Sequence, residues 1–184
     1  MPITTLDPIT ALVVIDMQKG IVSLPTAKPA AEITPRIAQL TKAFREHKLP
    51  VVLVNVAGGA PGRTDAGARK FSPAVDWAEL IPELDQQPSD HLVTKLQWGA
   101  FRGTSLDQYL RRKRVTQIVL VGIATSIGVE STARDAYELG YNVTLATDAM
   151  TDLSAESHQH SLEKIFPRLG ETGSTADVLT FLKK

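Results

Sequence analysis

Short runs of branched apolar residues recur along the chain and predict the strands of a sheet. Four of them are continuous rather than alternating, which is typical of strands buried on both faces of a parallel sheet. These four are ALVVID from Ala11, PVVLVNV from Pro50, QIVLVGI from Gln117 and NVTLAT from Asn142. A weaker run, HLVTK, begins at His91, and a last strand is expected near residues 168–172.

Segments with a helical period lie between these runs. In the clearest, AEITPRIAQLTKAFREHK, one face carries Ile33, Ile37, Leu40 and Phe44. Three further helices are expected in TSLDQYLRRKR from Thr104, IGVESTARDAYELG from Ile127 and AESHQHSLEKIF from Ala155. The alternation of strands and helices predicts the α/β class, as a three-layer α/β/α sandwich with right-handed crossovers.

Two stretches fit neither period and are expected to be loops. Residues 20–29 contain two prolines, and residues 57–73 are rich in glycine and proline. The second loop follows a strand end, which is where α/β proteins place their ligands. With 184 residues, 43% of them apolar, the chain matches one ordinary domain, so we expect a single domain over 1–184.

Charge and cysteine usage narrow the possible functions. The chain has no cysteine, which excludes disulfides, thiolate metal sites and sulfur nucleophiles. Twenty basic residues balance twenty acidic ones, so no net charge attracts nucleic acid or an anionic membrane. No signal peptide or membrane span is apparent. We expect a soluble cytoplasmic protein that acts on a small molecule.

Three features could carry chemistry. Asp16 ends the first strand, and Lys95 ends the HLVTK strand, at the sheet edge where ligands bind. The segment VGIATSIGVESTARDAYELGY passes from a strand through small residues into a helix, so that backbone N–H groups converge as they would around an oxyanion. Taken singly, each has a plainer interpretation: a turn aspartate, a solvated lysine, and a helix start capped by Thr125 or Ser126.

Together, the strings ALVVIDMQKG, VTKLQWGAF and GIATSIGVESTARDAYELGY, in this order, resemble the isochorismatase-like (cysteine hydrolase) family over essentially the whole chain. The resemblance implies a six-stranded parallel sheet with the active site at its C-terminal edge. It also implies that Asp16 is the acid/base aspartate and Lys95 the catalytic lysine. A cis peptide between Ile123 and Ala124, orienting the N–H groups of Ala124 and Gly128 toward one site, follows from the same resemblance.

The chain departs from that family at the nucleophile. Gly128 stands where the amidase members carry their cysteine, so an acyl-enzyme route is closed unless a hydroxyl replaces the thiol. True isochorismatases share a glycine at this place, and their cleavage of a vinyl ether needs an acid rather than a nucleophile. The Asp-x-His pair of metal-binding nicotinamidases is replaced by NVAGGAP, so neither a metal nor another cofactor is expected.

The residues expected to contact substrate are Ala124, Ile123, Arg63, Trp98 and Phe101. Trp98 and Phe101 could form an apolar wall or belong to the core, and Arg63 could bind a carboxylate or lie in solvent. His158 and His160 are two residues apart on a helix and are not expected to act as ligands.

Three functions remain open. The first is hydrolysis of a small substrate such as isochorismate, with Asp16 as general acid. The second is an amidase-like hydrolase in which Asp16 activates water, and the third is an inactive member that only binds a ligand. A homo-oligomer, dimeric or larger, is expected from the resemblance.

Overall fold

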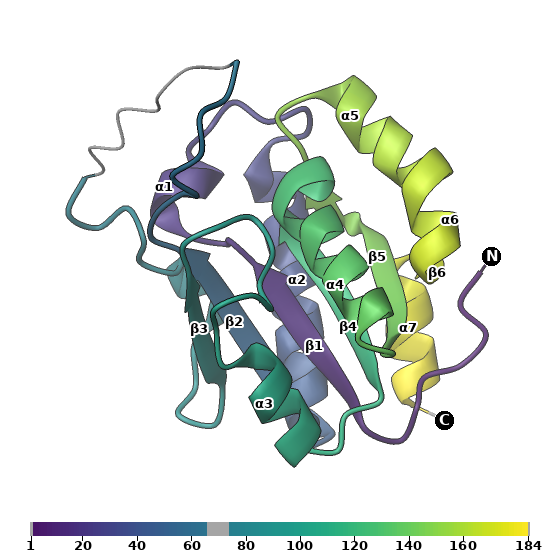
Figure 1. Ribbon diagram of the computed structural model, residues 1–184. Helices are drawn as coiled ribbons and strands as arrows, with labels where there is room; N and C mark the ends of the chain where they lie inside the picture. Colours follow the sequence, from purple (N-terminus) through teal and green to yellow (C-terminus); the bar gives the residue numbers. More distant parts are fainter. Residues whose placement is uncertain (1, 66–73, 184) are drawn as a thin grey trace.

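The computed structural model describes residues 2–65 and 74–183 and shows one mixed α/β architecture around a parallel sheet. The sheet has six strands in the order β3-β2-β1-β4-β5-β6, and every pair is parallel (Figure 1). The strands are β1 (Thr10–Ile15), β2 (Val51–Val56), β3 (His91–Lys95), β4 (Gln117–Ile123), β5 (Asn142–Thr151) and β6 (Glu171–Gly173). The predicted six-stranded parallel α/β fold is confirmed.

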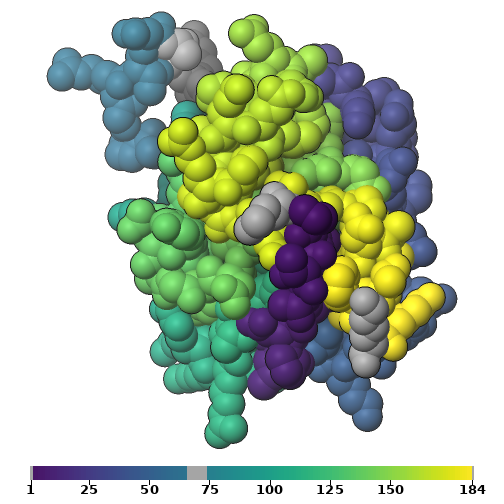
Figure 2. Space-filling model, turned by 90° about the vertical axis from the view of Figure 1, so that its right-hand side faces the viewer, coloured from purple at the N-terminus to yellow at the C-terminus, as the bar shows by residue number. Residues whose placement is uncertain are grey.

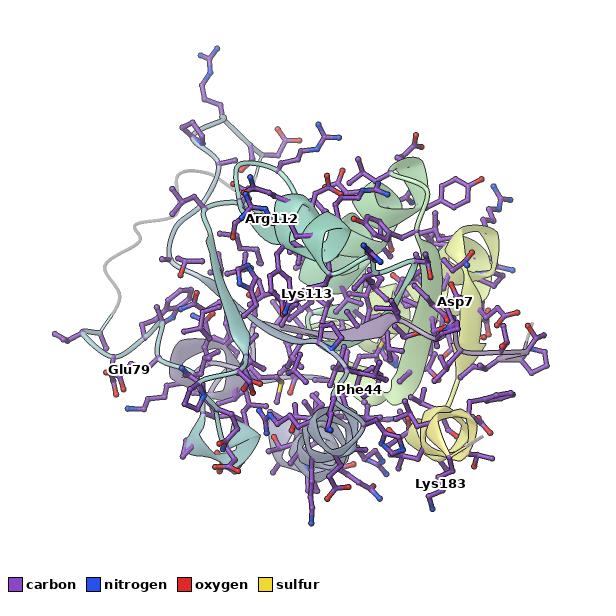
Figure 3. The ribbon with its side chains drawn as sticks, turned by 90° about the horizontal axis from the view of Figure 1, so that it is seen from below. Asp7, Phe44, Glu79, Arg112, Lys113 and Lys183 are labelled. Atoms are coloured by element: carbon purple, nitrogen blue, oxygen red, sulfur yellow. The ribbon has the colours of Figure 1, made fainter. Side chains whose placement is uncertain are left out.

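Helices cover both faces of this sheet, as the view from below shows (Figure 3). One face carries α2 (Ala30–Glu46) and α7 (Thr175–Leu182), and the other carries α3 (Leu106–Arg112), α4 (Glu130–Glu138) and α6 (Phe166–Leu169). The remaining helical segments are α1 (Lys19–Val22), η1 (Pro82–Leu84), η2 (Thr125–Val129), α5 (Ala155–His160) and η3 (Ser161–Ile165). No helix in the described ranges is long and apolar enough to cross a membrane.

Strand β1 lies in the middle of the sheet and contacts both helical layers. All six of its residues are buried. Ala11, Val13 and Ile15 belong to the core under α3, α4 and α6, whereas Leu12 and Val14 belong to the core under α2 and α7. This alternation explains the continuous apolar run, because neither side of the strand faces water.

Helix α2 shows the predicted amphipathic packing. Ile33, Ile37, Leu40 and Phe44 are each fully buried against the sheet, and Figure 3 shows Phe44 between the helix and the strands. Pro35 lies inside this helix, where it has no N–H to donate to the carbonyl of the residue four positions earlier.

Several predicted boundaries were wrong. The expected loop at residues 20–29 is helical at its start, where α1 extends to Val22. The last strand lies at Glu171–Gly173, because residues 166–169 form α6 instead. Helix α7, with a capping box between Ser174 and Asp177, was not anticipated. The described part of the second loop, residues 57–65, has no helix or strand, while residues 66–73 lie outside the described residues.

The N-terminal segment lies on the surface alongside α7 and below α5 and α6 (Figure 2). Thr4 donates two hydrogen bonds to Glu171, and the Asp7 N–H donates to the Gln117 side chain over 2.5 Å. These contacts join the segment to the N-terminal edge of the sheet, opposite to the edge described next.

Candidate active site

Asp16, Lys95 and Gly128 lie together at the C-terminal edge of the sheet. Asp16 directly follows β1, Lys95 is the last residue of β3, and Gly128 lies in η2, just beyond β4. Because β2 separates β1 from β3, the long lysine side chain spans the width of one strand to reach Asp16. The structure therefore brings together three residues that are far apart in the sequence.

Asp16 and Lys95 form a buried ion pair. Lys95 Nζ donates a hydrogen bond to Asp16 Oδ2 over 2.7 Å, and the two side chains are 1% and 7% exposed respectively. The second carboxyl oxygen, Asp16 Oδ1, is buried and has no hydrogen-bond partner among the described residues. A buried polar atom without a partner is costly, and a catalytic role is one of the reasons for which proteins retain such an atom.

The environment of Asp16 changes its acidity. Its pKa is raised from 3.8 to about 6, because desolvation by burial outweighs the attraction and the hydrogen bond of Lys95, which both lower it. Burial is the larger effect, so the carboxyl holds a proton at a pH where a solvated aspartate is fully ionised. Its backbone has a φ of 51°, which lies in the left-handed region that residues other than glycine rarely adopt. Such backbone strain is found preferentially at functional sites.

The turn after β4 brings Gly128 against this carboxyl. The Ile123–Ala124 peptide is cis, as expected, and residues Thr125–Val129 form a single turn of π-helix before α4 begins. A Cβ placed on Gly128 would lie 3.3 Å from Asp16 Oδ2 and 2.9 Å from Ile15 Cγ2. Any side chain at this position would therefore begin beside the Asp16 carboxylate.

The turn is held by hydrogen bonds to the end of β5 and to α5, and not by side-chain caps of its own. Neither Thr125 nor Ser126 caps the helix, so that interpretation of the sequence was wrong. Instead, the Ser126 N–H donates to Asp152 Oδ2 over 2.5 Å, and the Thr125 hydroxyl contacts the Thr151 carbonyl at 3.1 Å and His158 Nδ1 at 2.8 Å. The sequence contains no local signal for these contacts, because the partners lie 26 to 33 residues further along the chain.

The other residues that were predicted to contact substrate differ in their exposure to solvent. Ile123 and Ala124 are buried in the turn beside Gly128. Arg63 is exposed and makes no ion pair with any described residue. Trp98 is 60% exposed on the loop after β3. Phe101 lies in the core, with its ring centroid 5.8 Å from that of Tyr141, so the core interpretation describes its position.

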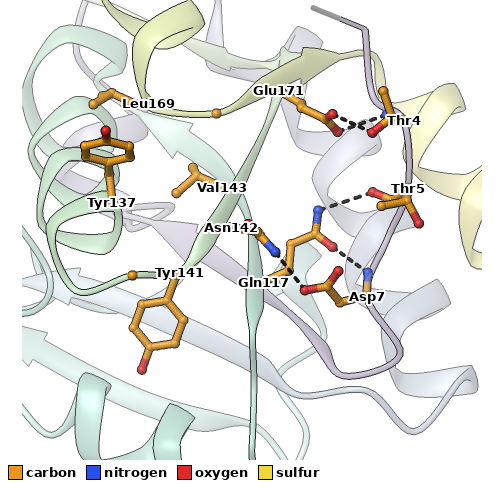
Figure 4. Close-up of a pocket in the computed structure, with 12 residues that line it drawn as sticks. Thr4, Thr5, Asp7, Gln117, Tyr137, Tyr141, Asn142, Val143, Leu169 and Glu171 are labelled. Atoms are coloured by element: carbon orange, nitrogen blue, oxygen red, sulfur yellow. Dashed lines mark hydrogen bonds between the residues drawn. The ribbon is translucent and has the colours of Figure 1, made fainter.

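A separate cavity of about 470 Å³ lies at the opposite edge of the sheet (Figure 4). Its polar groups bind one another: Asn142 donates to Asp7, and Gln117 donates to the Thr5 carbonyl. The cavity therefore belongs to the attachment of the N-terminal segment. In the described part of the chain, no cluster of three histidine or acidic residues is arranged to hold a metal ion.

Comparison with known proteins identifies the family. The family model described as "Isochorismatase domain" matches residues 10–177. An isochorismatase family protein of Bacillus subtilis, YwoC, is 47% identical over 95% of this chain and 94% of its own length. The ureidoacrylate amidohydrolase RutB of Pseudomonas syringae is 31% identical, over 93% of this chain and 82% of its own.

A solved structure gives the same result. An isochorismatase family protein from Burkholderia thailandensis superposes with a TM-score of 0.94 and is 44% identical, with 98% of both chains covered. The agreement therefore covers both the sequence and the fold. The chain therefore belongs to the isochorismatase family and is a hydrolase.

Proposed function

We propose that this hydrolase cleaves a small organic substrate of the vinyl ether class, such as isochorismate, with Asp16 as the general acid and without a covalent intermediate. The observation that carries the proposal is the Asp16 carboxyl, which is buried, has a pKa raised to about 6 and leaves Oδ1 without a partner among the described residues. An acid that operates near neutral pH needs a raised pKa of this kind.

The chemistry requires one proton at the right carbon. Asp16 protonates the terminal methylene of the enol ether, which leaves an oxocarbenium ion and an Asp16 carboxylate. Water adds to that ion and loses a proton, and the resulting hemiketal collapses to pyruvate and the released alcohol. The net reaction consumes one water, and the proton given up by water restores the acid.

Lys95 has a double role in this scheme. Its ammonium lies 2.7 Å from Asp16 Oδ2, where it stabilises the carboxylate that forms on proton transfer. A substrate carboxylate bound by Lys95 would offset the ammonium's charge and keep Asp16 protonated until reaction. We assign Arg63 and Trp98 to the mouth of the site, and the N–H groups of Ala124 and Gly128 to the polar end of the substrate.

Gly128 supports a route without a nucleophile. A Cβ at this position would lie 3.3 Å from Asp16 Oδ2, so we propose that Gly128 occupies the place of the cysteine of the amidase members. With no thiol in the chain, the Asp16 carboxyl is free to act on the substrate itself. We also propose that the enzyme works without metal or cofactor, in the cytoplasm, as a homo-oligomer.

A second candidate is an amidase-like hydrolase in which ionised Asp16 activates water for attack on an amide. The similarity to a ureidoacrylate amidohydrolase favours this alternative. A third, binding of a small ligand without turnover, predicts affinity but no product with any substrate.

The pH dependence of kcat/KM separates the two enzymatic candidates. An acid must be protonated, so activity on isochorismate should fall about tenfold per pH unit above the Asp16 pKa, which is about 6. A base must be ionised, so an amidase profile would rise through the same range. We therefore expect isochorismate, assayed beside several primary amides from pH 4.5 to 9, to give a falling limb. A rising limb with an amide would replace the first proposal by the second.

A further inference from the structure

The turn at residues 124–128 is joined to the end of β5 by three side chains that take no part in the proposed chemistry. They are Thr125, Asp152 and His158, together called the turn anchor below. Thr125 is fully buried within the turn, Asp152 is 1% exposed beyond the end of β5, and His158 is half-buried on α5. We propose that the turn anchor holds Gly128 against Asp16 and thereby sets the rate of hydrolysis, an inference that rests on the proposed function.

The hydrogen bonds of Thr125 define the protonation of His158. A threonine hydroxyl has one proton, and the Thr151 carbonyl, 3.1 Å away, can only accept it. His158 Nδ1, at 2.8 Å from the same hydroxyl, must then donate. Both contacts are satisfied together only when Nδ1 carries a proton, so His158 acts here as a donor that fixes the Thr125 hydroxyl.

Asp152 acts on the next residue of the turn. Its Oδ2 accepts the Ser126 N–H over 2.5 Å, and its Oδ1 accepts the Ser154 N–H over 3.3 Å. A hydrogen bond to an ionised carboxylate is stronger than one between neutral groups. Because the Asp152 carboxylate is buried, a shift of the turn would remove a hydrogen bond that offsets the cost of its burial.

The end of β5 is itself held by hydrogen bonds to the segment before α2, so the turn anchor has a fixed position relative to the sheet. The Ala27 N–H donates to the Asp152 carbonyl over 2.7 Å. The Thr151 hydroxyl donates to the Lys28 carbonyl over 2.9 Å and accepts from the Lys28 N–H over 3.1 Å. The segment before α2 therefore secures the strand end that holds the turn.

The position of the turn determines how well Asp16 is shielded from water. Gly128 approaches Asp16 so closely that its missing Cβ would lie 3.3 Å from Oδ2. Burial is the main cause of the raised pKa of Asp16. A turn released from β5 would admit water beside the carboxyl, so Asp16 would ionise more easily and would be a poorer proton store at neutral pH.

The test measures the Asp16 pKa by NMR titration of carboxyl carbons in full-length protein labelled at aspartate, with the signal assigned through Asp16→Asn. Thr125→Val and His158→Leu remove the bonding groups but keep similar volumes. We expect each to lower the Asp16 pKa by about half a unit or more. We also expect each to reduce kcat for isochorismate about tenfold at pH 7 with little change in KM.

Conservative variants and a matched control separate positioning from general loosening. Thr125→Ser keeps the hydroxyl and His158→Asn keeps a donor near Nδ1, so both should retain most of the Asp16 pKa shift. Thr144→Val deletes another buried hydroxyl of β5, one that accepts from Gln117 over 2.9 Å at the opposite edge of the sheet. It should lower the melting temperature and leave the Asp16 pKa unchanged.

The proposal is overturned if Thr125→Val and His158→Leu leave the Asp16 pKa unchanged, or if Thr144→Val changes that pKa by the same amount. If Thr125→Val does not fold, the half-buried His158→Leu decides. The titration does not depend on turnover. A protein without activity on vinyl ethers or amides would thus refute the proposed function, while the titration would still decide whether the turn anchor positions Gly128.

Discussion

Lys95 Nζ and Asp16 Oδ2 lie 2.7 Å apart in a pair that is almost completely shielded from solvent, yet the pKa of Asp16 is raised. An adjacent ammonium normally makes a carboxyl more acidic. Here the loss of hydration outweighs that attraction. The pair therefore combines a carboxyl that can carry a proton with a cation that stabilises it after the proton is given away.

Replacement of Asp16 by asparagine tests the acid directly. Asp16→Asn preserves shape and removes the transferable proton, so kcat should fall by about 100-fold or more. Circular dichroism and a thermal melt should show that the protein still folds. Full activity in this variant on any substrate would remove Asp16 from the mechanism.

Lys95→Met should change both binding and pH dependence. The ammonium lowers the Asp16 pKa, so its removal raises that pKa further, and the acid stays protonated to higher pH. The falling limb of kcat/KM should therefore move to higher pH than in the native enzyme. KM should rise as well, because the substrate carboxylate loses its cation. An unmoved limb would show that Lys95 does not act on the titrating group.

Gly128→Ala tests how tightly the turn is packed. The new Cβ would lie 2.9 Å from Ile15 Cγ2, so we expect overpacking to cost about 1–3 kcal/mol of unfolding free energy in urea titrations. Gly59→Ala is the matched control, because no atom of the described residues, apart from its two chain neighbours, lies within 4 Å of its new Cβ. Equal unfolding free energies for the two variants would mean that the turn can accommodate a Cβ at position 128 without strain.

Gly128→Cys asks whether the site accepts a nucleophile. The new thiol would lie near Asp16, which can accept its proton, and near the Lys95 ammonium, which favours the thiolate. Appearance of amidase activity, measured as ammonia release from primary amides, would support an amidase-type site that lacks only sulfur. If the variant folds and remains inactive on every amide tested, the correspondence with the cysteine position loses its support.

A second ion pair should matter for stability and not for activity. Arg45 makes a two-pronged contact with Asp90, whose side chain is 1% exposed, at 2.7 and 3.1 Å. Asp90→Ala should cost about 3 kcal/mol and lower the melting temperature by roughly 10 °C. Glu46→Ala breaks an exposed pair with Lys42 and should change stability by less than about 0.5 kcal/mol. Similar melting temperatures for both variants would contradict this difference.

The sheet could be predicted from the sequence because its strands are buried on both sides. The run from Gln117 to Ile123 has the same bounds in the prediction and in the structure, since no polar residue interrupts it. Helix α7 was missed because TADVLTFL is short and apolar, so that only its capping box, formed by Ser174 and Asp177, marks it. Edge strand β6 has three residues and carries no hydrophobic pattern.

The site was predictable in part for a related reason. Asp16 and Lys95 follow recognisable strands, and parallel strands end at one edge, so their meeting could be expected. The contacts from Asp152 and His158 to the turn could not, because they depend on how β5 and α5 pack. The burial of Asp16 and Phe101 also depends on how distant elements pack. Nothing local in the sequence shows that the Asp16 carboxyl loses its water or that Phe101 enters the core.

The contact between Ile15 and Gly128 also limits how this enzyme can change over time. Ile15 belongs to the central strand and to the core under α3, α4 and α6, yet its Cγ2 occupies the space that a Cβ at position 128 would need. The two positions are therefore epistatic: replacing Ile15 by a residue without a branch at Cβ would relieve the overpacking that a side chain at 128 causes. A lineage that lost the thiol and then acquired Ile15 would lose stability on direct reversion, even with every other part of the site intact.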